Sequence, residues 1–306
     1  MRRILLLGGS GFVGRALLAE LMRRPASAEF SITVPTRRRE RAKDLTVLPN
    51  VELVEADVHD AATLARLMVG QDAVVNLIGI LHDGEGEPYG PGFARVHVDL
   101  PRKIAVAAKA AGVDRVLHVS ALKAAADAPS DYLRSKAAGE ATLREAGLEP
   151  TIFQPTVIFG AGDAFLNLFA RLARIAPFFP LASPQARFQP VWVGDVAASL
   201  ADSLWHPESR SQTYALCGPR QYTLAELVAY AAAVSGRPRP IVSLPAAAAW
   251  WQARLLEFLP NPPLTRDNLR SMQVASVCGE HACLPFGRVA TPLEAIAPDY
   301  LACPRQ

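Results

Sequence analysis

Short apolar runs alternate with longer amphipathic segments over the first 160 residues. The runs are rich in leucine and β-branched residues and predict buried strands. They cover 3–7, 31–35, 51–57, 73–79, 115–120 and 150–159. Between them, apolar residues recur three and four positions apart, which predicts helices over 11–24, 61–69, 93–111 and 131–146. Strands that alternate with helices indicate an α/β protein with a doubly wound parallel sheet.

The pattern changes after Gly160, where prolines between positions 177 and 190 interrupt a loop-rich stretch. A strand-like run at 188–193 and a helix from Asp195 predict a return to the sheet. Further on, the sequence predicts a helix over 223–235, a strand over 240–244, a helix over 245–258 and an irregular tail. We expect a first domain over 1–160, to which 186–215 returns. A smaller, mostly helical lobe over 161–185 and 216–306 is expected to cap the strand ends, where open α/β sheets bind ligands.

Composition excludes several classes of protein. Half of the 306 residues are apolar and 20% are charged, which suffices for a core and excludes a disordered chain. The net charge of +3 is too small for a nucleic-acid binder. No stretch approaches the ~18 uninterrupted apolar residues of a membrane span. The basic and apolar start resembles a signal peptide, but Arg15 and Glu20 interrupt it. We expect a cytoplasmic protein, with peripheral contact at the inner face of the membrane as the alternative.

The four cysteines all lie in the last third of the chain, at Cys217, Cys278, Cys283 and Cys303. They are too few and too late to form a disulfide framework, and a reducing compartment fits them best. His281 lies between two of them, but a closed zinc site needs a second ligand pair that the remaining cysteines do not supply. We therefore expect no metal site.

A glycine-rich turn follows the first predicted strand and opens the first predicted helix. It reads Gly8-Gly9-Ser10-Gly11-Phe12-Val13-Gly14. One glycine allows the tight turn, one lets backbone N–H groups reach a pyrophosphate, and one allows close packing of helix on strand. The anion then lies at the positive end of a helix. The pattern predicts a Rossmann-type dinucleotide site that includes Gly8, Gly11, Phe12, Val13 and Gly14.

The end of the second predicted strand indicates which cofactor binds. In NAD sites a carboxylate there accepts hydrogen bonds from the ribose hydroxyls. This strand instead runs into Thr36-Arg37-Arg38-Arg39, and no carboxylate appears before Glu40. Arginine forks suit a phosphate, so NADP(H) is favoured over NAD(H), with Arg37 as the first candidate and Arg38 as the second. A solvated basic loop is the alternative.

Two further strand ends supply candidates for the adenosine part of the cofactor. Asp57 can accept a hydrogen bond from the adenine amino group, and Val58 follows it. The fourth strand ends in Leu77, Ile78 and Gly79, which can line the adenosine and ribose. Leu77 and Ile78 are equally consistent with sheet core, whereas Gly79 suggests close approach of a ligand or a backbone.

A serine, a tyrosine and a lysine form the catalytic candidates. Ser120 closes the fifth predicted strand, and Tyr132 and Lys136 follow on a predicted helix. The spacing of four puts the phenol and the ammonium on one helical face. We expect the ammonium to lower the pKa of the phenol, so that Tyr132 can exchange a proton with a carbonyl or alcohol oxygen. The Ser120 hydroxyl can bind the same oxygen.

These motifs, with several others, resemble a known superfamily over most of the chain. The other segments are Val34–Arg37, Asn76–Gly79, His118–Ser120, Tyr132–Glu140, Pro155–Gly160, Asp163–Phe169, Gln189–Val196 and Leu264–Asp267. Together they resemble the extended or atypical short-chain dehydrogenase/reductases, to which NAD-dependent epimerases and dehydratases belong. More narrowly, they resemble the family of the NADPH-binding accessory subunit of respiratory complex I and its bacterial relatives.

The resemblance implies an NADP(H)-binding Rossmann domain with Pro155 and Val157 near the nicotinamide and Ser120, Tyr132 and Lys136 in the catalytic positions. It does not imply turnover, because the complex I subunit is regarded as structural. His97 stands where many extended dehydrogenases carry an asparagine, which weakens the analogy for a proton relay.

Three functions remain open. The first is an NADP(H)-dependent oxidoreductase, or a related epimerase or dehydratase, that acts on a carbonyl or alcohol. The second is a non-catalytic NADPH-binding accessory or assembly protein of a quinone-linked respiratory complex. Its contact surface would be the predicted helix at 250–258, whose tryptophans, leucines and Phe258 can lie at a membrane or in a partner groove, or form the inner face of the lobe. The third is a nucleotide sensor without chemistry.

Overall fold

The computed structural model describes residues 2–24, 29–279 and 284–302. Seven parallel strands form the central sheet in the order β11-β6-β5-β4-β1-β2-β3. Their bounds are Arg2–Leu7 (β1), Phe30–Thr36 (β2), Val51–Glu55 (β3), Ala73–Asn76 (β4), Arg115–Val119 (β5), Thr151–Pro155 (β6) and Thr213–Leu216 (β11). The strand order reverses between β1 and β4, which is where open α/β sheets form a crevice. The predicted doubly wound sheet is confirmed.

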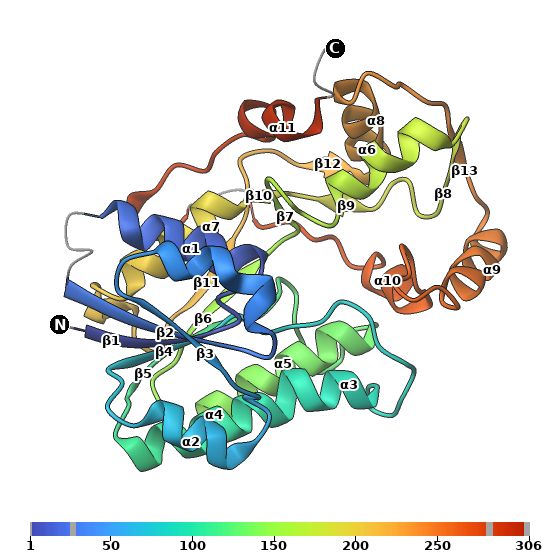
Figure 1. The fold of residues 1–306 in the computed structure, drawn as a ribbon. Coiled ribbons are helices and arrows are strands. Elements are labelled where there is room, and N and C mark those ends of the chain that lie inside the picture. Colours follow the sequence, from blue (N-terminus) through green and yellow to red (C-terminus); the bar gives the residue numbers. More distant parts are fainter. Residues whose placement is uncertain (1, 25–28, 280–283, 303–306) are drawn as a thin grey trace.

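Helices cover both faces of this sheet (Figure 1). Their bounds are Phe12–Arg23 (α1), Ala61–Met68 (α2), Pro91–Phe93 (α3), Leu100–Ala111 (α4), Asp131–Glu145 (α5) and Val193–Ser203 (α7), with a 3₁₀ helix at Arg39–Val47. Side chains of β1 show the two cores that result. Ile4 and Leu6 pack with α1 and α7, whereas Leu5 and Leu7 pack with α2 and α4. All four are fully buried, because successive side chains of a strand point to opposite faces.

A second group of elements lies beyond the carboxyl ends of the strands (Figure 1). It holds Ile158–Phe159 (β7), Leu166–Ile175 (α6), Phe179–Leu181 (β8), Arg187–Phe188 (β9), Val191–Trp192 (β10), Tyr222–Thr223 (β12), Leu224–Val234 (α8), Ile241–Ser243 (β13), Ala246–Leu256 (α9), Arg266–Ser271 (α10) and Leu293–Leu301 (α11). The strands form three pairs, β10-β7, β12-β9 and β13-β8. Short 3₁₀ helices cover Pro207–Ser209 and Pro285–Gly287.

The return to the central sheet differs from the sequence prediction. The run at 188–193 does not join the seven-stranded sheet, because Pro190 divides it into β9 and β10, which pair with β12 and β7. The strand that does return is β11, which the sequence pattern missed. It has only four residues, mostly exposed or half-buried, so it carries little apolar signal. The predicted irregular tail also contains two helices, α10 and α11.

Other boundaries differ in ways that matter for the site. The fourth strand ends at Asn76 rather than at Gly79, and the predicted strand at 150–159 breaks after Pro155. The predicted helix at 93–111 is interrupted by a π-helical segment, Ala94–Asp99. Pro101 lacks the N–H that would bond the carbonyl of His97 in a regular α-helix. That carbonyl instead lies against Gly139 of α5, where an added Cβ would come within 2.1 Å of the oxygen.

Candidate cofactor and active site

The glycine turn brings β1 and α1 into very close contact. Gly8 has a φ of +83°, which a glycine adopts without strain, and its carbonyl accepts the Gly11 N–H at 2.9 Å. A Cβ on Gly14 would lie 2.4 Å from that same carbonyl oxygen and 2.5 Å from the Cα of Gly9. Gly9 is equally constrained, because a Cβ there would meet Val34 at 2.8 Å. Only glycines allow this packing.

The N-terminus of α1 carries no protein cap. Gly11 is the N-cap residue, no side chain bonds the first-turn N–H groups, and no acidic residue lies in that turn. Phe12 lies at this end with its ring beside Gly160, and Val13 packs against the core. Unpaired N–H groups and the helix dipole make this end suited to an anion.

Arg37 and Arg38 directly follow β2 and are exposed. No salt bridge involves either of them among the described residues. Arg15 on α1 links this segment to the glycine turn, because it donates to the Ser10 and Arg41 carbonyls and pairs with Asp44. The segment that carries these two arginines is therefore tied to the helix that starts at the glycine turn.

The candidate residues that follow β3 and β4 differ in how deeply they are buried. Asp57 is exposed after β3, and its carboxylate accepts the His59 N–H at 3.0 Å. Val58 is buried in the core with α2 and α4. Leu77 and Ile78 are half-buried and pack against opposite cores of the sheet. Val58, Leu77 and Ile78 therefore contribute to the core, whether or not they also contact a ligand.

Ser120 presents a buried hydroxyl immediately after β5. Its N–H donates to the Phe153 carbonyl at 2.7 Å, which fixes the backbone. Its Oγ has no hydrogen-bond partner in the structure, although buried hydroxyls normally have one. Pro155 lies opposite, since its carbonyl accepts the Leu122 N–H at 2.9 Å, whereas the Val157 carbonyl accepts the Val191 N–H at 3.0 Å. A substrate oxygen is a partner that the Ser120 hydroxyl can take.

Tyr132 and Lys136 lie one turn apart on α5, as the spacing predicted. The Lys136 ammonium is buried, donates to the Val119 carbonyl at 3.2 Å and lies 5.9 Å from the centre of the Tyr132 ring. A Cβ on Gly79 would lie 3.1 Å from Lys136 Nζ, so Gly79 leaves room for the lysine. The group that approaches Gly79 in this structure is thus a side chain of α5.

The expected lowering of the pKa of Tyr132 is wrong. Burial raises the pKa of the Tyr132 phenol to about 12 instead of lowering it. Burial also lowers the pKa of Lys136 to about 8, against the attraction of Glu140. Removing both groups from water disfavours their charged forms more than the distant ammonium favours a phenolate. Near neutral pH, Tyr132 is a neutral phenol and Lys136 is a cation.

His97 occupies the π-helical segment and is fully buried. Its Nε2 accepts the Ile80 N–H at 3.1 Å, and its Nδ1 lies 2.9 Å from Ser135 Oγ, which in turn donates to the Tyr132 carbonyl. Burial lowers the pKa of His97 to about 2, so the ring is neutral and Nδ1 carries the hydrogen. Both ring nitrogens are used, so His97 orders α5 rather than offering a free group to a proton relay.

Asp267 of α10 caps the helix that carries Tyr132 and Lys136, which the sequence reasoning did not foresee. Its carboxylate accepts the N–H groups of Asp131 at 2.8 Å and Tyr132 at 3.1 Å. Ser130 bonds a third N–H, and Arg270 pairs with Asp267 at 3.1 Å. Thr265 and Asn268 form a capping box that predicts the start of α10, but the contact with α5 has no local signal.

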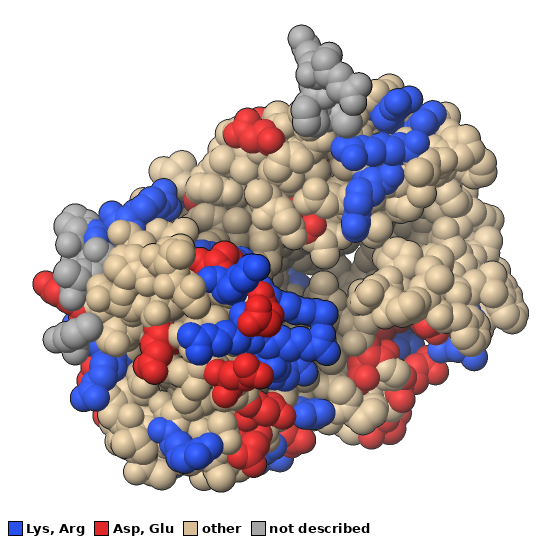
Figure 2. All heavy atoms as spheres, viewed as in Figure 1, with Lys and Arg blue, Asp and Glu red and all other residues tan. Residues whose placement is uncertain are grey.

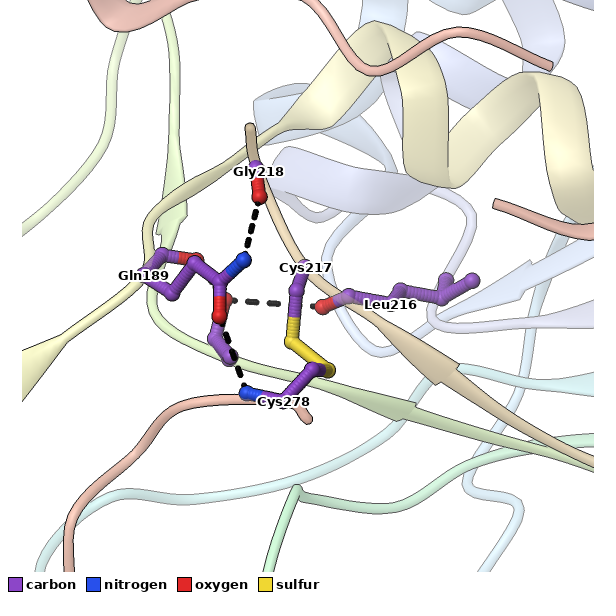
Figure 3. The surroundings of a disulfide bond; sticks show 6 residues. Gln189, Leu216, Cys217, Gly218 and Cys278 are labelled. Atoms are coloured by element: carbon purple, nitrogen blue, oxygen red, sulfur yellow. Dashed lines mark hydrogen bonds between the residues drawn. A yellow bond between two sulfur atoms is a disulfide. The ribbon is translucent and has the colours of Figure 1, made fainter. Parts of the chain in front are cut away.

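A disulfide packs with Leu122, two residues after Ser120 (Figure 3). Cys217 directly follows β11 and is bonded to Cys278, 61 positions away, with the Cα atoms 6.2 Å apart. Gln189 holds both ends, because it donates to the Gly218 carbonyl and accepts the Cys278 N–H at 2.9 Å. The expectation that excluded a disulfide framework therefore missed this pair. Of the zinc candidates, His281 and Cys283 lie outside the described residues.

Comparison with known proteins identifies the family. Residues 8–162 match a family model described as NAD(P)H-binding. The rat protein "NADH dehydrogenase [ubiquinone] 1 alpha subcomplex subunit 9, mitochondrial" is 31% identical over 94% of this chain and 76% of its own length. A Caulobacter vibrioides ceramide reductase is also 31% identical, over 79% of this chain and 73% of its own length. This chain belongs to the NAD(P)H-binding short-chain dehydrogenase/reductases.

Solved structures share the fold of this NAD(P)H-binding protein. The NADPH-dependent quinone oxidoreductase QOR2 of Escherichia coli, solved with NADPH, has a TM-score of 0.75 at 22% identity and covers 97% of this chain and 99% of its own. The UDP-glucuronic acid 4-epimerase of Bacillus cereus has a TM-score of 0.69 at 16% identity. At these identities the likeness is one of fold. The uncapped end of α1 and its glycine packing fit the pyrophosphate of a nicotinamide dinucleotide.

Proposed function

We propose that the protein is an NADPH-dependent reductase that acts on a carbonyl group, using Ser120, Tyr132 and Lys136. The observation that carries this is the buried Ser120 Oγ, which has no hydrogen-bond partner in the structure. The preceding residue, Val119, accepts a hydrogen bond from the Lys136 ammonium, which lies 5.9 Å from the centre of the Tyr132 ring. We propose that the elements over 161–185 and 216–306 form the substrate lobe. A hollow between the two groups of elements is visible in Figure 2.

The protonation states favour the direction of reduction. A bound NADPH supplies the hydride that the carbonyl carbon receives. Tyr132 is a neutral phenol and can give its proton to the carbonyl oxygen, while the Ser120 hydroxyl donates a hydrogen bond to the same oxygen. Lys136 is a cation and stabilises the phenolate that remains until water returns the proton. Related epimerase or dehydratase chemistry begins with the same proton exchange in the opposite direction.

The proposed preference for NADPH rests on Arg37, with Arg38 behind it. Both are exposed and directly follow β2, and no carboxylate ends that strand. Replacing Arg37 by alanine should weaken NADPH binding by about tenfold and leave NADH binding nearly unchanged. Calorimetric titration with both nucleotides measures this, with Arg39→Ala as the matched exposed control. Equal losses for the two nucleotides would contradict the assignment.

The reductase proposal is tested with Tyr132→Phe. NADPH oxidation is followed by nicotinamide absorbance with a quinone, an azo dye and a ceramide in which a hydroxyl has been oxidised to a ketone, compound classes that the names of related proteins suggest. The variant should bind NADPH like the wild type and lose at least about 100-fold in rate. A rate that survives the substitution would remove the phenol from the mechanism.

A second candidate function is a non-catalytic accessory protein of a quinone-linked respiratory complex, at the inner face of the membrane. The name of the rat relative and the exposed apolar side chains from Trp250 to Phe258 favour it. This role predicts tight NADPH binding without turnover on any member of the panel. Co-purification of the tagged protein with respiratory-complex subunits, abolished by Trp251→Gln, would support it.

A further inference from the structure

Exposed large apolar side chains gather on one part of the molecule. Eight of the thirteen such side chains in the described ranges lie between residues 175 and 259. They are Ile175, Phe178, Val242, Trp250, Trp251, Leu255, Phe258 and Leu259, and we call them the apolar surface. Figure 2 shows a broad uncharged area on the side where Figure 1 labels β8, β13 and α9. Clustering of this kind marks an interaction site rather than the usual scatter of exposed residues.

The elements that carry the apolar surface are neighbours in space. β8 pairs with β13, with Val242 opposite Pro180. Gln252 of α9 donates to the Pro180 carbonyl at 3.0 Å, so α9 adjoins the same strand pair. On α9 and just beyond it, Trp251, Leu255 and Phe258 are 61%, 66% and 74% exposed. Their spacing of four and three places them on one helical face.

The charge around this surface is predominantly positive. The segments 164–182 and 227–259, which build it, contain five arginines and one acidic residue, Glu257, which pairs with Arg254 at 3.6 Å. The arginines are Arg171, Arg174, Arg237, Arg239 and Arg254. Figure 2 shows basic side chains next to the uncharged area. Tryptophan beside arginine is the composition of helices that lie in the interface of a membrane with anionic lipids.

The same charge argues against a second copy as the occupant. In a two-fold dimer the same surface meets itself, so these arginines would face arginines. A bilayer with anionic headgroups instead offers apolar chains to the tryptophans and phosphates to the arginines. None of the helices in the described ranges has the length and apolar character needed to cross a bilayer. The contact is therefore a surface one.

We propose that the apolar surface docks the protein on anionic membranes, with α9 lying in the lipid interface. The proposal goes beyond the reductase function and needs no turnover. A membrane location gives the protein access to apolar compounds dissolved in the bilayer.

The test is flotation of the purified full chain with vesicles. We expect it to float with vesicles of phosphatidylcholine and about one-third phosphatidylglycerol, and more weakly with phosphatidylcholine alone. The variant Trp251→Gln/Leu255→Gln/Phe258→Gln should partition at least about tenfold less. Arg171→Gln/Arg174→Gln should remove most of the preference for the anionic vesicles. The control Val69→Gln/Val106→Gln changes two side chains that are as exposed but lie in the first domain, and it should float like the wild type.

Each other outcome decides against the proposal. A wild type that floats with neither vesicle, or a triple variant that floats unchanged, overturns it. Light scattering after gel filtration tests the alternative occupant, because a wild-type dimer that becomes monomeric in the triple variant, without flotation, assigns the surface to a second copy. NADPH titration and thermal unfolding of the same samples show that every variant is folded, and they keep failure here separate from failure of the reductase proposal.

Discussion

Helices α1 and α5 both begin near the carboxyl ends of the sheet strands, but only the N-terminus of α5 is capped by side chains of the protein. At α1 the N-cap is a glycine, no side chain bonds the first turn, and that turn holds no acid. At α5, Ser130 and Asp267 together accept three N–H groups, and Asp131 adds a negative charge. One helix end is left for a ligand, and the other is closed by the protein.

The difference corresponds to two tasks. An anion that binds reversibly needs N–H groups that have no acceptor within the protein. The dipole of α1 adds to the attraction. A proton donor needs a fixed position, because a displacement of about 1 Å can cost much of the rate. At the start of α5, Asp267 accepts the backbone N–H of Tyr132, which fixes the position of this residue. We expect changes at α1 to act on nucleotide affinity and changes at α5 to act on rate.

The largest effect is expected at Gly14. Gly14→Ala would place a Cβ 2.4 Å from the Gly8 carbonyl, so α1 must move away from β1. We expect at least about a 100-fold loss of NADPH affinity by calorimetry and a loss of about 1–3 kcal/mol in the free energy of unfolding by urea titration. Gly84→Ala is the control, because a Cβ there meets open space. Unchanged affinity would mean that the glycine turn does not form the nucleotide site.

Gly11→Asp tests the open end directly by supplying the missing cap. Gly11 has extended backbone angles that aspartate can adopt, and its carboxylate can bond the first-turn N–H groups. NADPH affinity should fall at least about tenfold, while the free energy of unfolding stays level or rises by about 0.5–1 kcal/mol. Gly11→Asn provides the same cap without charge and should lose less affinity. Loss of stability together with affinity would point to steric damage.

At α5, Asp267→Ala removes the cap that comes from α10. We expect a loss of about 1–2 kcal/mol in the free energy of unfolding, since two N–H groups lose their acceptor and Arg270 loses a partner. The turnover rate should fall roughly tenfold while the NADPH dissociation constant stays unchanged. Asp267→Asn keeps one acceptor oxygen and should recover part of the rate. Equal losses of rate and nucleotide affinity would show a general structural defect.

The two helix ends also differ in how far the sequence predicts them. At α1 the strand, turn and helix lie within one short segment, so the glycine spacing of Gly8, Gly11 and Gly14 predicts both the local fold and its constraint. At α5 the sequence predicts the helix and the shared face of Tyr132 and Lys136. The cap at Asp267 is 136 positions from Asp131, and nothing in either segment indicates that they meet.

The same reason explains the other misses. The Cys217–Cys278 bond spans 61 positions, and β11 is too short and too exposed to stand out. The pKa of Tyr132 could not be read from its spacing to Lys136, because burial depends on how α5 packs against Phe93 and His97. Local patterns predict elements and turns, whereas contacts between distant segments decide electrostatics and capping. The roles of Ser120, Tyr132 and Lys136 stay predictions until variants are measured.

The smallest expected effect is the pH dependence of the turnover rate, which depends on the titratable groups on and around α5. The pKa of Lys136 is lowered to about 8 by burial, and those of His97 and His118 to about 2 and about 3. Raising the pH through about 8 removes the ammonium that stabilises the phenolate, so the turnover rate should be halved near pH 8 and fall above it. Below that, the rate should stay level to about pH 5, because both histidines remain neutral.

Stability should change in the opposite sense over the same alkaline range. Between about pH 8 and the ordinary lysine value near 10.5, the unfolded chain binds a proton at Lys136 that the folded protein has released. The contribution of Lys136 to the free energy of unfolding therefore increases as the pH rises, while the turnover rate falls. Urea unfolding across this range, compared with Lys136→Met, isolates the contribution, and NMR of ¹³C-labelled lysine gives the midpoint directly. A titration midpoint of Lys136 at or above 10 would mean that water or an anion reaches the ammonium. The turnover rate should then stay level through pH 8.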